Sequence, residues 1–213
     1  MSTTPPENRP RLRRDQRRAQ LLGAALDAFS EGGYHQTLMD DIAERAGVSK
    51  PVLYQHFDSK LDLYLAIARG VADEVLTTLS GALASSDSNP ERVRACVATF
   101  FDFVDRPGSG FPLLFASDMG QEPAVAALLE ETRRASGDAL AAEVAEATSL
   151  PREEAVLVGM ALAGVAQTAA MHWYQSPGDL SKERATDLVV ALAWGGLDGL
   201  PVEGETEEQH DAG

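Results

Sequence analysis

The sequence predicts an all-α protein of about nine helices, and three observations lead to that prediction. Apolar residues recur at i, i+3, i+4 and i+7, the spacing of one helix face, along most of the chain. Prolines beside polar residues mark several helix starts, and Pro-Gly pairs mark breaks. No stretch alternates apolar and polar residues long enough to predict a strand.

Composition divides the chain into four parts. With 213 residues, 44% hydrophobic and 24% charged, the protein is long enough for a real core. We expect residues 1–12 to form a flexible basic arm and residues 202–213 to form a disordered acidic tail. Between them, we expect a small helical domain at residues 13–60 and a larger helical domain at residues 61–201. The single cysteine, Cys96, and the lack of a secretory signal predict a cytoplasmic location.

Charge is unevenly distributed between the two ends. The net charge is −15, which taken alone argues against a nucleic-acid partner. However, residues 1–60 carry nine basic and eight acidic side chains, whereas residues 61–213 carry nine and 25. Such a molecule can present its N-terminal part to a polyanion while the acidic part stays in solvent.

The first two helices have start and stop signals. An apolar stripe over Leu22–Phe29 predicts the first helix, which Gly32-Gly33 ends. Thr37 predicts the N-cap of the second helix, and Asp40, three residues on, completes a capping pair. Gly47 ends that helix.

The remaining helices follow from similar signals. Ser49 caps a third helix of about two turns, and Ser59 with Asp62 starts a long fourth one. Further starts are predicted at Asn89-Pro90, Glu122-Pro123, Pro151 and Ser181.

Residues 155–174 carry no formal charge over 20 positions, the length of a membrane span. Three polar side chains, Gln167, Thr168 and His172, interrupt the segment, and an acidic flank precedes it. These features favour a helix buried in a soluble bundle or at a subunit interface. We therefore expect no membrane association.

Residues 38–57 have the pattern of a helix-turn-helix. Ile42, Val48 and Leu53 are spaced to lock the two helices together across Gly47. Six side chains then remain at the surface of the second, very short helix: Lys50, Pro51, Val52, Tyr54, Gln55 and His56. Such a helix suits the major groove of DNA, where side chains near its start reach base edges.

The segment AGVSKPVLYQHFDSK, residues 46–60, resembles the TetR family of bacterial transcriptional regulators, and the resemblance extends over residues 32–66. It implies that Lys50 and Val52 read bases and that Tyr54, His56 and Lys60 hold phosphates. The DNA-binding residues predicted in all are Arg17, Arg18, Thr37, Ser49, Lys50, Pro51, Val52, Tyr54, Gln55, His56 and Lys60. The structural alternative for each is an ordinary packing or solvated side chain.

The family resemblance implies that the larger domain binds an effector. Large apolar side chains cluster there and favour an apolar ligand site, although ordinary core residues have the same pattern. The predicted pocket residues are Phe100, Phe101, Phe103, Phe111, Leu114, Phe115, Met119, Met160, Gln167, Met171 and Trp173.

The recognition segment and three further segments resemble the actinobacterial TetR-type regulators of fatty-acid synthase genes. The three are Phe101-Asp102-Phe103, residues 122–127 and residues 193–197. This likeness implies a long-chain acyl-CoA effector that changes the grip on DNA. The alternative within the family is a regulator of an efflux pump or a catabolic operon that senses another hydrophobic molecule.

A two-fold dimer would match a pseudo-palindromic operator. The helix at 155–174 and the last helix are expected to form a four-helix interface between two chains. The predicted interface residues are Ala155, Gly159, Ala163, Leu188, Val189, Leu192 and Ala193.

An all-α enzyme is the remote alternative. The four histidines show no metal-ligand spacing with one another or with Cys96, and no nucleophile elbow or phosphate-binding glycine loop is found. The sequence therefore predicts no metal and no cofactor.

Overall fold

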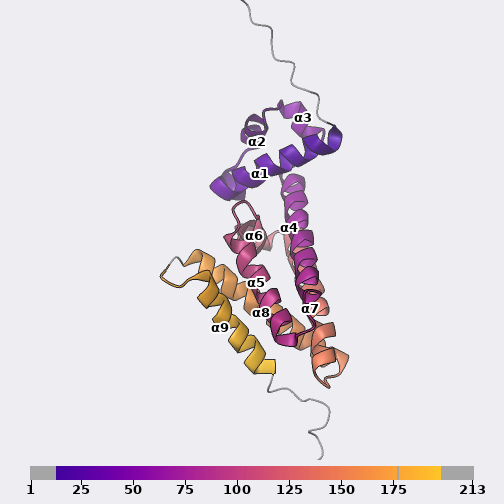
Figure 1. Ribbon diagram of the computed structural model, residues 1–213. Coiled ribbons are helices and arrows are strands. Elements are labelled where there is room, and N and C mark those ends of the chain that lie inside the picture. Colours follow the sequence, from indigo (N-terminus) through magenta and orange to yellow (C-terminus); the bar gives the residue numbers. More distant parts are fainter. Residues whose placement is uncertain (1–12, 177, 198–213) are drawn as a thin grey trace, which may run out of the picture. The chain divides into compact units, whose positions relative to one another are not determined.

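The computed structural model describes residues 13–176 and 178–197, and over this part the chain is all-α, as the sequence predicts (Figure 1). The predicted arm 1–12 and tail 202–213 lie outside the described residues. The helices are α1 (Arg14–Gln36), α2 (Met39–Arg45), α3 (Lys50–Tyr54), α4 (Lys60–Leu83), α5 (Asn89–Asp105), α6 (Phe111–Phe115), the 3₁₀ helix η1 (Asp118–Gln121), α7 (Pro123–Ala147), α8 (Arg152–Gln175) and α9 (Lys182–Leu197).

The described chain forms two compact units that divide within α4, between Ile67 and Ala68. The sequence places the division a few residues earlier, after residue 60. Because α4 runs without a break from Lys60 to Leu83, no loop marks the division. The N-terminal unit holds α1 to α3 and the start of α4, and the C-terminal unit holds the rest.

The N-terminal unit packs around one core. Its fully buried side chains come from all four helices or the turn after α3: Leu21, Ile42, Leu53, Phe57, Leu63 and Tyr64. Gly33 has a φ of 71° and breaks the helical path of α1. Gly47, with a φ of 63°, makes the turn between α2 and α3.

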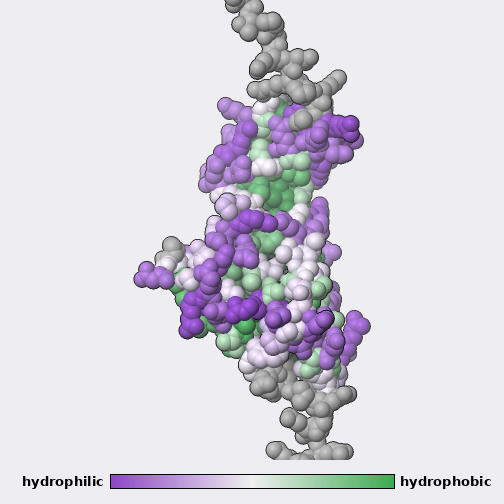
Figure 2. All heavy atoms as spheres, in the orientation of Figure 1, coloured by the Kyte–Doolittle hydropathy of each residue, from purple (hydrophilic) through white to green (hydrophobic). Residues whose placement is uncertain are grey.

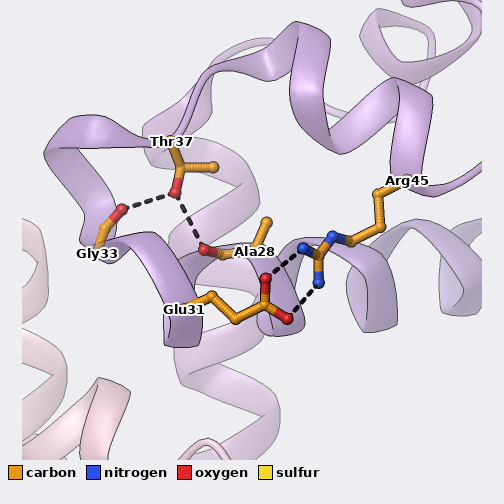
Figure 3. A network of polar contacts seen from close by, with 5 residues as sticks. All are labelled: Ala28, Glu31, Gly33, Thr37 and Arg45. Atoms are coloured by element: carbon orange, nitrogen blue, oxygen red, sulfur yellow. Dashed lines mark hydrogen bonds and ion pairs between the residues drawn. The ribbon is translucent and has the colours of Figure 1, made fainter.

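Thr37 does not cap α2, which corrects the prediction from sequence. The N-cap of α2 is Leu38, whose backbone N–H donates to the Asp41 carboxylate over 3.0 Å. Thr37 is buried, and its one O–H lies between two α1 carbonyls, that of Gly33 at 2.7 Å and that of Ala28 at 3.1 Å (Figure 3). The turn after Gly33 directs Thr37 back onto α1, and the capping pair therefore shifts by one residue.

The C-terminal unit is a bundle in which α8 packs against α5, α7 and α9. The contact between α7 and α8 is especially close. A Cβ atom added at Gly159 of α8 would lie 2.5 Å from the carbonyl oxygen of Gly137 on α7. Small residues let these two backbones approach, and the buried side of α8 consists of small residues such as Ala155 and Ala170.

In the described part of the chain, α8 is the one helix long and apolar enough to cross a membrane by length and composition. Within the C-terminal unit, 28% of its most apolar stretch is buried. Leu157 and Val165 are among its exposed side chains. A second protein surface over α8 would cover these side chains without a bilayer.

Candidate nucleic-acid interface and effector cavity

The helix-turn-helix exposes the side chains that the sequence assigns to DNA. Ser49 is the N-cap of α3, and Pro51 lies in its first turn, where a missing N–H costs nothing. Lys50, Tyr54 and Gln55 are exposed, and Val52 and His56 are half-buried. Hydrophilic residues cover much of the visible surface over α1 to α3 (Figure 2). One side of α3 is therefore packed into the core through Leu53, and the opposite side is exposed to solvent.

Lys50, the only cation on α3, forms an ion pair with Asp40 of α2. The Lys50 Nζ to Asp40 Oδ1 distance is 2.8 Å. This hydrogen bond to a carboxylate raises the pKa of Lys50 above its usual value. The ammonium therefore stays charged, and both side chains remain more than half exposed.

Arg18 contacts the two residues His56 and Phe57, which follow α3. Its guanidinium donates to the His56 carbonyl over 3.2 Å and lies over the Phe57 ring at 4.3 Å. Gln20, two residues on, donates to the carbonyl of Ala46 over 2.7 Å, next to the turn. Arg17 donates to the Gln20 side chain over 2.7 Å. These contacts hold the helix-turn-helix against α1, and a phosphate contact by Arg17 or Arg18 stays a prediction.

A bidentate ion pair also joins α1 to α2. The Arg45 guanidinium donates to both carboxylate oxygens of Glu31 (Figure 3). The Arg45 bond lowers the pKa of Glu31, which therefore stays ionised. The pair is exposed, so its effect on stability is small.

The Lys60 ammonium is directed into the N-terminal unit. It donates to the carbonyls of Tyr34 (2.8 Å), His35 (3.4 Å) and Thr37 (3.0 Å). It also lies 4.4 Å from the centre of the Tyr34 ring. An ammonium has three N–H donors, and these carbonyls accept all three. Lys60 thus joins the start of α4 to the end of α1, and its contact with phosphate stays a prediction.

We expect Lys60→Met to lower the free energy of unfolding by about 1–3 kcal/mol, because it removes three hydrogen bonds from a charged donor. Lys50→Met is the matched control, since the Lys50 ammonium makes only an exposed ion pair, and its loss should lower stability much less than the loss of Lys60. Urea denaturation of both variants measures the difference. Equal losses would show that the Lys60 contacts do not stabilise the unit.

A cavity of about 140 Å³ lies in the C-terminal unit. Four of the predicted pocket residues line it: Phe100, Phe115, Met160 and Gln167. The sequence pattern does not identify the other lining residues, which are Val75, Thr132, Arg133, Ser136, Ala163, Gly164 and Thr168. Most of these are polar or small, and a search for large apolar residues passes over them. Arg133 and Thr168 are exposed, so the cavity reaches the surface there.

The other predicted pocket residues lie elsewhere. Phe101, Phe103, Phe111, Leu114 and Met119 are buried in the core. The Phe111 ring packs against Phe115 and Phe103, with centroids 4.4 and 5.8 Å apart. Trp173 packs on Phe101 and donates its indole N–H to the Leu180 carbonyl over 2.9 Å, and Met171 is half-buried. These residues do not line the cavity.

Two smaller cavities, of about 30 and 50 Å³, lie beyond its wall. The 30 Å³ cavity shares Phe100 and Ala163 with the 140 Å³ one, and Cys96 and Leu162 with the 50 Å³ one. Burial raises the pKa of the Cys96 thiol to about 12, so the thiol stays neutral and acts as a small apolar wall residue. The three cavities therefore lie in a row.

The predicted dimer residues fall into two groups. Ala155, Gly159 and Ala163 are buried, with Ala155 and Gly159 packed on α7 of the same chain, and so cannot contact a second copy. On α9, Leu188 and Leu192 are exposed by 48% and 64%, whereas Ala193 is buried and Val189 lines the smallest cavity. Figure 2 shows hydrophobic residues at the surface over α9.

Among the described residues, no group of three or more His, Cys, Asp or Glu side chains is placed to hold a metal ion.

Comparison with known proteins agrees with this architecture. The model for bacterial regulatory proteins of the tetR family matches residues 21–67, and the tetracyclin repressor-like C-terminal domain matches residues 90–196. The chain is 40% identical to the HTH-type transcriptional activator FasR of Mycolicibacterium smegmatis over 192 residues. This aligned region covers 90% of this chain and 88% of FasR.

Two solved structures extend the likeness to the fold. A TetR-like regulator from Rhodococcus sp. RHA1 is 30% identical with a TM-score of 0.71, covering 89% of this chain and 100% of the other. FadR from Bacillus subtilis, in complex with stearoyl-CoA, is 16% identical with a TM-score of 0.69, covering 82% and 96%. The homologues are transcriptional regulators and not enzymes. The chain therefore belongs to the TetR family of bacterial regulatory proteins.

Proposed function

We propose that this TetR-family regulator binds a pseudo-palindromic operator as a homodimer in the cytoplasm and that a hydrophobic effector controls the binding. The observation that carries the proposal is the exposure of Lys50, Tyr54 and Gln55 along the five-residue helix α3 and its C-cap, which Gly47 and Leu53 fix against α2. Lys50 supplies donors at the start of the helix, and Tyr54 and Gln55 supply them at its end, for base edges and phosphates.

Two exposed apolar stripes support the dimer. Leu157, Ala161 and Val165 lie on one side of α8, and Leu188 and Leu192 lie on one side of α9. Four helices, two from each chain, would bury both stripes and remove the exposed apolar surface of α8. This interface keeps Leu188 and Leu192 from the interface predicted from sequence, but it uses the opposite side of α8 from Ala155 and Gly159.

The row of cavities supports an elongated apolar effector. Aromatic, methionine and alanine side chains line much of the cavities, polar side chains such as Thr132 and Gln167 line part of the 140 Å³ one, and the exposed Arg133 also lines it. This arrangement suits a long acyl chain with an anionic head group, and we propose a long-chain acyl-CoA. Phe100 and Ala163 stand between the first two cavities, so a long chain would have to displace these side chains. If the effector binds best when the two α3 helices of the dimer are differently spaced, its binding would change the affinity for DNA.

Titration of a protein–operator complex with stearoyl-CoA tests the effector. We expect DNA binding to change with stearoyl-CoA and not with free CoA. Arg133→Gln should weaken the response about tenfold, because it removes the cation at the cavity mouth, and should leave operator binding without effector unchanged. Arg134→Gln is the matched control, since Arg134 pairs with Glu130 and does not line the cavity. Equal responses from both variants would place the head group elsewhere.

DNA binding itself is tested by selection from a random duplex library, followed by fluorescence anisotropy at several salt concentrations. We expect a selected two-fold symmetric site and affinity that falls as salt rises. Failure of the protein to enrich any sequence would overturn the DNA-binding function.

A further inference from the structure

Asp40 forms an ion pair with the Lys50 ammonium, although its carboxylate does not cap α2. The carboxylate that caps α2 belongs to Asp41, which accepts from the Leu38 N–H. Asp40 contacts Lys50 instead, at 2.8 Å, and 63% of its side chain is exposed. An exposed pair of this kind contributes little to folding stability. The ion pair lies at the start of α3, whose outer side is exposed, and there it can contact a ligand.

The pair presents donors and an acceptor side by side. An ammonium has three N–H groups, and Asp40 Oδ1 accepts one of them, which leaves two for other acceptors. The second carboxylate oxygen of Asp40 has no partner among the described residues and accepts further hydrogen bonds. The ion pair can therefore stay intact while both partners contact a third group.

A G·C base pair offers the complementary pattern in the major groove. Guanine presents O6 and N7 as acceptors, and the N4 amino group of cytosine is a donor beside them. In an A·T pair, the thymine O4 acceptor would face the carboxylate and be repelled. We propose that Asp40 is a specificity-determining residue which, together with Lys50, selects one G·C pair in each half-site. The inference rests on the proposed function, in which α3 enters the major groove.

Asp40 also acts on DNA of unrelated sequence. Its negative charge offsets the positive charge of Lys50, the only cation on α3. Without Asp40, Lys50 would be free to neutralise a phosphate at any sequence. The carboxylate therefore lowers the affinity for random DNA and helps at one base pair, and both effects increase selectivity.

The test compares base preference, which a merely structural role would not change. The wild-type protein first selects its operator from a random duplex library, and each base pair of that operator is then replaced in turn. For the wild type we expect one position in each half-site where G·C is preferred about tenfold. Asp40→Asn should lose most of this preference and should steepen the salt dependence on random DNA by roughly one unit. Lys50→Met should lose the same preference, and the double variant should lose no more.

Glu44→Gln is the matched control, because it removes one negative charge from the same helix without a contact to Lys50. It should keep the wild-type base preference. An unchanged preference in Asp40→Asn, with the wild type selecting an operator, would overturn this inference alone. A wild type that selects no operator would overturn the DNA-binding function and this inference with it.

Discussion

Leu192→Asp is expected to convert the protein to monomers and to weaken operator binding at least about 100-fold. Leu192 is 64% exposed on α9, in the stripe that we propose to lie between two copies. In a two-fold interface the same patch of both chains is in contact, so each substitution would bury two carboxylates. A buried unpaired charge strongly disfavours association. A monomer then binds one half-site and loses the gain from linkage.

Analytical ultracentrifugation measures the oligomeric state of this variant, and fluorescence anisotropy measures its affinity for the operator. Because Leu192 is exposed in the single chain, circular dichroism should show a folded monomer. The control is Ala127→Asp, which adds the same charge at an exposed position of α7. This control should remain a dimer with full affinity. A dimeric Leu192→Asp protein with unchanged operator binding would show that the stripe on α9 is not the interface.

Local signals in the sequence predict the helices and the exposed face of α3. Prolines beside polar residues mark the starts of α5, α7 and α8 correctly, because the N–H groups at a helix start have no acceptor within the helix. Ser59 caps α4 as expected, its hydroxyl accepting from the Asp62 N–H over 3.0 Å. Such signals act over three or four residues, which a linear pattern contains in full.

The partners of charged side chains depend on contacts between distant residues. Lys60 finds three carbonyl acceptors about 25 residues earlier, and Arg18 reaches the carbonyl of His56, 38 residues later. The family's spacing identifies both positions, but it does not say whether a cation faces the solvent or an inner carbonyl. The cavity shows a similar limit, since Thr132, Ser136 and Gly164 line it without any pattern that separates them from surface residues.

The small residues of α8 show why an interface is difficult to assign from sequence. Ala155 and Gly159 correctly indicate that another helix approaches closely, but the pattern does not say which chain supplies that helix. In the structure it is α7 of the same chain, through Gly137 and Ala141. The stripe therefore belongs to the core of the C-terminal unit, and its substitution should change stability and not dimerisation alone.

Gly159→Ala is accordingly expected to lower the free energy of unfolding by about 2–4 kcal/mol. The added Cβ would lie 2.5 Å from the Gly137 carbonyl oxygen and 2.9 Å from the Ala141 nitrogen. Both are backbone atoms in the middle of α7, so relief requires the two helices to move apart. That movement would loosen the packing of Ala155 on Ala141 and Val144 as well.

Gly164→Ala, on the same helix, provides the matched control with the opposite sign. No atom lies within 4 Å of a Cβ at this position. Replacing a helical glycine by alanine without a clash should raise stability by about 0.5–1 kcal/mol. Urea denaturation at two protein concentrations measures both variants and separates folding from association. If Gly159→Ala lowered only the concentration-dependent part of the transition, the close contact at Gly159 would lie between chains and not between α7 and α8 of one chain.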